Sequence, residues 1–232
     1  MILAILQVRM NSPRLPGKAL APLHQASLVW RQVERLRLAR CVSRIIVATS
    51  DSPEDAPLAG HLLERGQAVF RGSATNLAER FRRCVDAAGP VRHLVRVKGD
   101  SAFLDPGLVD ETVRLAINSG ADYTSNRVRR SFPRGLEVEV VTPQALLSQP
   151  ASDAAESSSP FAQIRSQPER YPQAHCLARR DVSSLDWRVK TAADLAFANG
   201  VYGALYPVDA GFGYEEVLSL TQNRQDLRRW AA

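Results

Sequence analysis

Short apolar runs alternate with helix-forming stretches through the first half of this chain, and this alternation limits its fold more than any other feature. The runs are rich in β-branched residues, and the stretches between them carry an apolar face and capping residues such as Ser27 and Asn76. Strands joined through helices run parallel, so we predict an α/β fold whose mostly parallel sheet is flanked by helices. The predicted strands cover residues 2–6, 44–48, 68–70, 94–97 and 122–125, and the predicted helices cover 27–40, 54–65, 76–88 and 105–118.

The pattern changes after residue 126. Residues 136–141 alternate as a strand, 187–189 form a short strand, Thr191 caps a helix to about residue 206, and 214–220 are helical. Residues 148–160 are rich in Ser, Ala and Pro and are typical of a linker. With 232 residues, we expect a single domain over 1–232 with a flexible or dimerisation arm around 148–171.

The loop at residues 7–18 follows the first predicted strand and gathers positive charge. Arg9, Arg14 and Lys18 lie within ten residues, and two prolines and a glycine restrict the backbone around them. Such a loop suits a polyanion, and a nucleoside triphosphate is one. It has neither the G-x-G-x-x-G turn of dinucleotide binders nor the full Walker pattern, because Gly17-Lys18 lacks the upstream glycine and the following Ser or Thr. From charge alone, a solvated basic loop is an equally good interpretation.

The order of residues in this loop resembles the nucleotide loop of the sugar nucleotidyltransferases. The similarity is greatest to the cytidylyltransferases of the spore-coat polysaccharide biosynthesis type, which are related to the CMP-Kdo and CMP-sialate synthetases. Their loop runs roughly Q-A-R-M-x-S-x-R-L-P-G-K, and this chain departs only at Val8. The resemblance implies a nucleotide-diphospho-sugar transferase-like fold with a small dimerisation or acceptor subdomain. It also implies that Arg9, Arg14 and Lys18 hold the triphosphate and the leaving pyrophosphate.

Two further segments resemble the nucleotide side of that family. Residues 46–51 match its second strand, and polar Thr49 and Asp51 follow the apolar run where a strand's carboxyl end would face a ligand. Residues 70–73, with Leu77 and Arg80, match its third segment, which implies that Arg71 and Arg80 lie close to the nucleotide. For Arg80, an exposed helix residue is an equally good interpretation.

The remaining motifs concern metal and acceptor. Residues 96–106 resemble R-x-T-G-D-C-P-L-I-D-P, so Asp100 matches the carboxylate that the family uses for Mg²⁺, and a hard oxygen at a strand end suits that ion. Residues 133–140 resemble P-D-G-L-D-V-E-V, which lines the acceptor pocket. Glu137 and Glu139 would then share one strand face and contact the acceptor, or else form the wet face of a half-buried strand.

The last motif departs from the family. Residues 185–195 align with L-R-W-T-V-D-T-P-E-D-L, and the second metal aspartate falls on Lys190. A protonated lysine cannot bind Mg²⁺, although its ammonium can neutralise phosphate charge or contact a substrate. The first half of the chain thus keeps the family pattern better than the second half.

The formal net charge of +6 favours an anionic partner. The basic residues are scattered and no aromatic-rich RNA motif occurs, so we expect a small-molecule ligand and no nucleic acid. Three distant cysteines predict neither a disulfide framework nor a C-x-x-C metal pair. No uncharged apolar stretch approaches the roughly 18 residues of a membrane span, so we expect no membrane contact and a cytoplasmic location.

These observations predict a CTP-dependent nucleotidyltransferase that uses Mg²⁺. It would couple CTP to a small anionic or hydroxylated acceptor (a sugar acid, a sugar or a phosphonate), release pyrophosphate and assemble as a homodimer. CTP, Mg²⁺ and the dimer rest on the resemblance alone. The alternative is a nucleotide-binding or partner protein of the same fold that has lost catalysis, which Lys190 favours.

Overall fold

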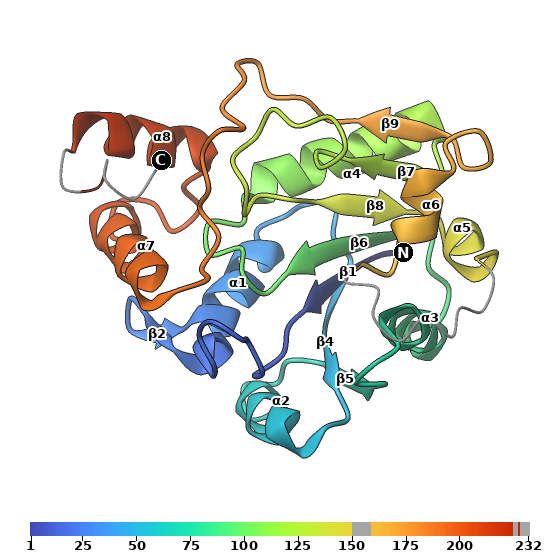
Figure 1. Ribbon diagram of the computed structural model, residues 1–232, viewed down its shortest axis with the longest axis horizontal. Coiled ribbons are helices and arrows are strands. Elements are labelled where there is room, and N and C mark those ends of the chain that lie inside the picture. Colours follow the sequence, from blue (N-terminus) through green and yellow to red (C-terminus); the bar gives the residue numbers. More distant parts are fainter. Residues whose placement is uncertain (150–158, 225–226, 228–232) are drawn as a thin grey trace.

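The computed structural model describes residues 1–149, 159–224 and 227. Within these residues one mixed sheet has the strand order β5-β4-β1-β6-β8-β7-β9, and only β8 runs antiparallel to its neighbours (Figure 1). The mostly parallel α/β sheet predicted from the alternating pattern is therefore confirmed. The strands are β1 (Ile2–Gln7), β4 (Arg44–Ser50), β5 (Val69–Gly72), β6 (His93–Lys98), β7 (Tyr123–Ser125), β8 (Glu139–Val141) and β9 (Gln173–His175).

The helices begin where the sequence places capping side chains. Ser27, Asn76, Asp105 and Thr191 each accept a hydrogen bond from a backbone N–H in the first turn of the helix that follows. The helices are α1 (Leu28–Arg37), α2 (Ala56–Leu63), α3 (Leu77–Ala88), α4 (Pro106–Ser119), α5 (Pro143–Leu147), α6 (Ala162–Ser166), α7 (Ala192–Leu205) and α8 (Tyr214–Asn223), with 3-10 turns η1 (Lys18–Leu20) and η2 (Pro53–Asp55).

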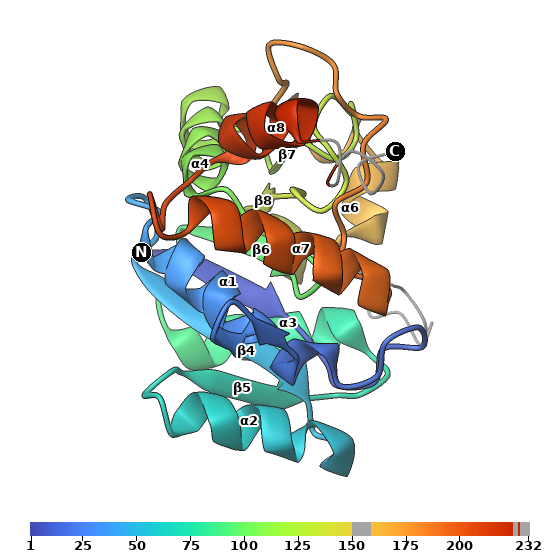
Figure 2. The same cartoon turned by 90° about the vertical axis from the view of Figure 1, so that its left-hand side faces the viewer.

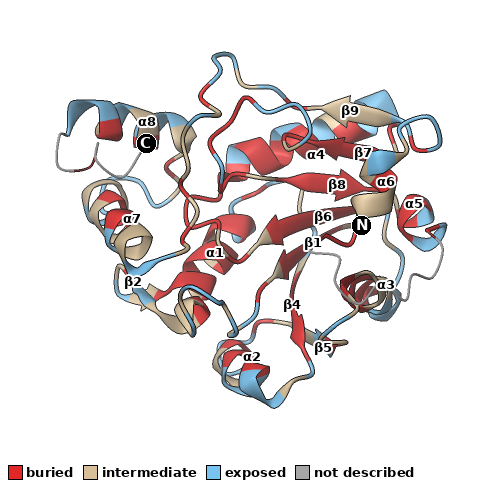
Figure 3. Ribbon diagram, in the orientation of Figure 1, coloured by how far each residue is buried: buried red, intermediate tan, exposed pale blue. Residues whose placement is uncertain are grey.

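Alternating side chains on the strands feed two cores, one on each face of the sheet. Ala4 and Leu6 of β1 pack into the core that includes α1, α4 and α7, whereas Leu3 and Ile5 pack into the core beneath α3 and α6. Figure 2 shows α7 beside α1, and Figure 3 shows the central strands β1, β6 and β8 as largely buried. The buried strands thus support the loops that follow their carboxyl ends.

Two local predictions were wrong, and one element was not predicted. The strand predicted at 136–141 is shortened to β8, and residues 187–189 form no strand, although a single bridge pairs Arg134 with Asp186. The hairpin of β2 (Pro22–Leu23) and β3 (Ala26–Ser27) was not predicted. Its turn has positive φ at His24 and Gln25, which glycine or asparagine usually supplies.

Part of the predicted arm at 148–171 packs into the body of the protein. Phe161 is fully buried and meets the rings of Phe81 and Tyr123 edge-on, and Ile164 and Tyr171 join the same core. Residues 159–171 therefore contribute side chains to the core, and the flexible or dimerisation arm around 148–171 stays a prediction. Residues 150–158 of that prediction lie outside the described residues.

Candidate functional site

An open pocket of about 170 Å³ lies where β1 and β6 end side by side. The chain leaves β1 toward β4 on one side and returns to β6 on the other, which is the switch point where open α/β sheets bind ligands. The lining residues come from the two loops that follow these strands: Gln7, Val8, Arg9, Asn11, Ser12, Lys18, Lys98, Gly99 and Asp100. The pocket therefore unites the predicted triphosphate loop with the predicted metal carboxylate.

Close backbone packing fixes the two loops against each other. The Gly99 N–H donates to the Gln7 carbonyl at 2.8 Å, and a Cβ at Gly99 would lie 2.7 Å from Val8 Cγ2. No real Cβ fits at that distance, so this approach requires glycine. Because Gly99 precedes Asp100, the contact sets the position of the carboxylate.

Asp55 holds the loop at residues 7–18, the predicted triphosphate loop, in place, and we did not predict this role from the sequence. Its Oδ1 accepts from the Met10 N–H at 2.7 Å, and its Oδ2 accepts from the Ser50 N–H at 3.0 Å. Burial would raise the pKa of Asp55, but these hydrogen bonds outweigh it and keep the pKa below its ordinary value. Gly17, at φ 75°, closes the loop with an N–H bond to the Met10 carbonyl.

Lys18 lies deepest of the three predicted triphosphate residues. Its ammonium donates to the Val189 carbonyl at 2.7 Å. Burial and the charges of Lys98 and Arg14 lower the pKa of Lys18, against the opposing effect of Asp100. A cation held among cations favours an incoming anion, which is what the predicted role requires.

Asp100 offers one carboxylate oxygen to a ligand. Its Oδ2 accepts from Lys98 Nζ at 3.1 Å, whereas its buried Oδ1 has no hydrogen-bond partner among the described residues. An unpartnered carboxylate oxygen fits Mg²⁺, which binds proteins through one or two carboxylates and fills its shell with phosphate oxygens and water. No group of three or more His, Cys, Asp or Glu residues that could hold a metal occurs in the described part of the chain. An ion here would depend on substrate oxygens.

Four residues predicted to lie at the nucleotide flank the pocket rather than line it. Arg71 donates to the carbonyls of residues 50, 51 and 52, so it braces the loop after β4, and Asp51 is exposed beside it. Thr49 is fully buried, so its predicted nucleotide contact does not fit this structure.

Arg80 is also buried, and the alternative of an exposed helix residue is wrong. It donates to the Ser73 carbonyl at 2.9 Å, and Arg9 donates to the neighbouring Ala74 carbonyl at 3.2 Å. Burial and the nearby Arg9 lower the pKa of Arg80. Arg80 therefore fixes the segment against which Arg9 rests. Arg14 is exposed on the same loop, outside the pocket lining.

The two predicted acceptor carboxylates occupy different environments. Glu139 is buried: its Oε1 accepts from Tyr123 Oη at 2.7 Å and from Arg165 at 3.1 Å, and its Oε2 pairs with Arg96. Burial would raise the pKa of Glu139, but Arg96 and Tyr123 hold it below its ordinary value. Both oxygens of Glu139 are thus bonded to side chains within the protein, so its predicted contact with an acceptor does not fit this structure.

Glu137 precedes β8 and is only half-buried. Its Oε2 accepts from the Gly135 N–H at 2.9 Å, and its Oε1 lies 3.7 Å from Arg130. The shared strand face predicted for the two carboxylates is therefore wrong, because residue 137 is not in the strand.

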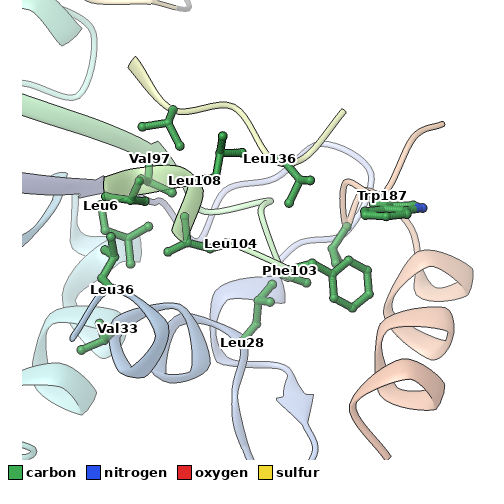
Figure 4. Close-up of a cluster of buried hydrophobic side chains, with 14 of the residues drawn as sticks. Leu6, Leu28, Val33, Leu36, Val97, Phe103, Leu104, Leu108, Leu136 and Trp187 are labelled. Atoms are coloured by element: carbon green, nitrogen blue, oxygen red, sulfur yellow. The ribbon is translucent and has the colours of Figure 1, made fainter. Parts of the chain in front are cut away.

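Lys190 lies at the end of an extended segment that is anchored beside the pocket. Val189 donates from its N–H to the Asp100 carbonyl at 2.9 Å, and the buried ring of Trp187 meets Phe103 edge-on (Figure 4). The Lys190 ammonium donates to Asp186 Oδ2 at 2.9 Å. Asp186 was not among the predicted site residues, although it stands four residues before Lys190 with opposite charge.

Comparisons with known proteins identify the family to which the chain belongs. A family model described as cytidylyltransferase matches residues 3–224, so the chain belongs to the cytidylyltransferase family. It is 36% identical over 150 residues to the spore coat polysaccharide biosynthesis protein SpsF of Bacillus subtilis, an alignment that covers 63% of this chain and 61% of SpsF. It is 35% identical over 114 residues to the 3-deoxy-manno-octulosonate cytidylyltransferase of Geobacter metallireducens, covering 48% of this chain and 43% of that enzyme. These alignments span less than two thirds of either relative.

Solved structures share the fold. A cytidylyltransferase from Leptospira borgpetersenii superposes with a TM-score of 0.90 at 23% identity, covering 97% of this chain and 95% of the other. A CMP:2-keto-3-deoxy-manno-octonic acid synthetase complexed with CTP superposes with a TM-score of 0.65 at 13% identity, covering 87% and 98%. In the described residues, no helix is long and apolar enough to cross a membrane.

Proposed function

We propose that this chain is a CTP-dependent cytidylyltransferase that couples CTP to a small anionic or hydroxylated acceptor and releases pyrophosphate. The observation that carries the proposal is the pocket between β1 and β6, which Lys18, Arg9 and Asp100 all line at the switch point of the sheet. Cytidine as the base is supported by the family and by the activities for which the relatives are named, and no residue contact argues for it separately.

In the proposed reaction an acceptor oxygen attacks the α-phosphorus of CTP in line. The bond from that phosphorus to the bridging oxygen breaks, and pyrophosphate leaves. Lys18, Arg9 and Arg14 hold the phosphates and neutralise the charge that develops on the leaving group. Arg80 and Asp55 keep the two sides of the loop in place, and Arg71 braces the turn near Asp51.

Mg²⁺ bound at Asp100 Oδ1 would add positive charge to the phosphates. Gly99 sets the position of Asp100, whose Oδ1 is buried, and Lys98 donates to the other carboxylate oxygen, Oδ2. On the acceptor side, we propose that half-buried Glu137 contacts the acceptor, whereas Glu139 supports the sheet from within.

The alternative is a nucleotide-binding protein of this fold that has lost catalysis. It is favoured by Lys190, which stands where the resemblance places a second metal carboxylate and whose ammonium binds Asp186. A protein of this kind would bind CTP and form no pyrophosphate.

Pyrophosphate release tests the two functions. The protein is incubated with CTP, Mg²⁺ and pooled sugar acids, sugars and phosphonates, and ATP, GTP and UTP serve as matched controls. The proposed enzyme forms pyrophosphate with CTP only when acceptor is present. CTP binding in calorimetry without pyrophosphate from any pool would favour the non-catalytic alternative, and no CTP binding would contradict both.

We also propose a homodimer that pairs through the region around 148–171. Leu147, just before that region, and residues 168–170 within it are exposed. Light scattering at micromolar concentration should give about twice the chain mass of 25.5 kDa. A monomer mass would contradict the dimer.

A further inference from the structure

Residues 186–190 present three charged side chains on one side of an extended segment. Trp187 and Val189 are buried in the core, so alternation places Asp186, Arg188 and Lys190 on the opposite, partly exposed side. Backbone bonds from Val189 to Asp100 and to the Lys18 ammonium fasten this segment to the pocket. The charged side is therefore held in a fixed position next to the proposed reaction site.

Asp186 binds both of the cations beside it. Its Oδ1 accepts from Arg188 Nε at 2.9 Å, and its Oδ2 accepts from Arg188 Nη2 and, at 2.9 Å, from Lys190 Nζ. Burial would raise the pKa of Asp186, but these hydrogen bonds hold the pKa well below its ordinary value. One carboxylate thus orders two cationic side chains that would otherwise repel each other.

The loop before β8 adds further positive charge to this cluster. Arg134 is bridged to Asp186 through the backbone, and Arg130 lies 3.7 Å from Glu137. Burial and the guanidiniums of Arg134 and Arg188 lower the pKa of Arg130, and Glu137 opposes them. Four cations share two carboxylates, so two positive charges remain in excess. The members are Arg130, Arg134, Arg188, Lys190, Glu137 and Asp186.

The cluster lies between the two halves of the proposed site. Val189 donates to the Asp100 carbonyl, and Gly135, whose N–H donates to Glu137, packs against the backbone N of Arg188, so Arg188 lies between the two carboxylates. Hydrogen bonding to Asp186 chiefly raises the pKa of Arg188, and the charges of Glu137 and Asp100 add to the effect. Asp100 belongs to the proposed phosphate side and Glu137 to the proposed acceptor side. A group bound by Arg188 would belong to a molecule reaching toward Asp100 from the acceptor side.

We propose that Arg188 and Lys190, held by Asp186, form a subsite for a doubly charged oxyanion group on the acceptor, such as a phosphonate or a phosphate monoester. This inference rests on the proposed function and narrows it to an anionic acceptor. Two excess positive charges are neutralised by a dianion, whereas a neutral sugar would leave them unpaired. Arg188 and Lys190 still have N–H donors beyond those that Asp186 uses.

Sulfate serves as a dianion probe and acetate as a monoanion probe. Each is titrated by calorimetry into protein saturated with CTP and Mg²⁺, at constant ionic strength, so that the triphosphate loop is already occupied. The test variant is Arg188→Gln with Lys190→Gln. The control variant is Arg83→Gln with Arg92→Gln, which removes the same charge from exposed positions on α3 and just before β6.

Wild type and control should bind sulfate about tenfold more tightly than acetate, and the test variant should lose about tenfold in sulfate affinity. The single variant Lys190→Gln, which keeps the Arg188–Asp186 pair, should show a smaller loss in the same direction. CTP affinity should change less than about threefold in every variant.

Equal sulfate affinity in wild type and test variant, or equal affinity of wild type for sulfate and acetate, would overturn the subsite. So would a parallel loss of CTP affinity, because the two cations would then serve the triphosphate. Failure of the proposed function is a separate result: wild type would bind no CTP, and the sulfate difference between variants would still decide the subsite.

Discussion

Replacing Glu139 by glutamine should destabilise the fold by about 3–5 kcal/mol. The side chain is buried and accepts from Arg96, Arg165 and Tyr123. Glutamine keeps the shape but removes the negative charge that faces two guanidiniums, so the substitution leaves cations uncompensated in a dry environment. Breaking one partner of a buried ion pair has this magnitude, whereas exposed pairs contribute about 1 kcal/mol or less.

Urea unfolding followed by circular dichroism measures the effect. In a chain of this length a loss of 3–5 kcal/mol corresponds to a fall in Tm of about 6–20 °C. Glu79→Gln is the matched control, because the Glu79 side chain on α3 is 45% exposed and lies 3.8 Å from Arg83. Its unfolding free energy should change by less than about 1 kcal/mol.

The pH dependence gives a second readout for Glu139. Its pKa is lower in the folded protein than its ordinary value. Its stabilisation is thus complete above the unfolded pKa and is lost as pH falls through the folded pKa. Wild-type and Glu139→Gln stabilities should therefore converge in acid. A loss below about 1 kcal/mol at pH 7, with a large change in acceptor KM instead, would refute the structural role and restore the acceptor contact.

Three further predictions follow from the site and the hairpin. Arg14→Ala or Lys18→Ala should weaken CTP binding about tenfold in calorimetry, because each removes a charge-assisted phosphate contact, and unchanged affinity in both would remove the loop from the site. Lys190→Asp should strengthen Mg²⁺ binding in the absence of CTP, since it adds a carboxylate near Asp100; an unaltered metal titration would mean that residue 190 faces away from the ion. Gln25→Gly should raise the free energy of unfolding by about 0.5–1 kcal/mol in urea, because Gln25 has φ 67°, and a loss of stability would contradict strain in this turn.

Local sequence chemistry predicted the elements that depend on local interactions. Ser27 and Asn76 act within one turn of their own helices, so their caps were visible in the sequence, and the alternation of strands and helices predicted the sheet. The loop at 7–18 was equally visible, because its charges and its prolines are close together in the chain. Its geometry now joins Lys18 to Asp100 in one pocket.

Contacts between residues far apart in the chain could not be predicted from local sequence patterns. The alternation of polar and apolar residues around Glu139 is the same whether that strand face is exposed or covered by another element. Here it is covered by Arg165, which comes from α6 and is 26 residues away in the chain. The turn at His24 and Gln25 has no Asn-Gly signal, so the hairpin was missed. Asp55 was also missed as a support of the loop, because its bond to Met10 spans 45 residues.

The most direct test of the central claim is to map the CTP site by amide chemical shifts. CTP with Mg²⁺ is titrated into isotopically labelled protein, and the shifts are compared with those of the Lys18→Ala variant. We predict the largest changes at Gly99, Asp100 and the loop at 7–18, with saturation lost in the variant. A second pocket of about 160 Å³, lined by residues that include Arg179, Tyr214 and Ser219, provides an internal comparison. Shifts centred on that pocket, or identical saturation in the variant, would contradict the assignment of the nucleotide site to the ends of β1 and β6.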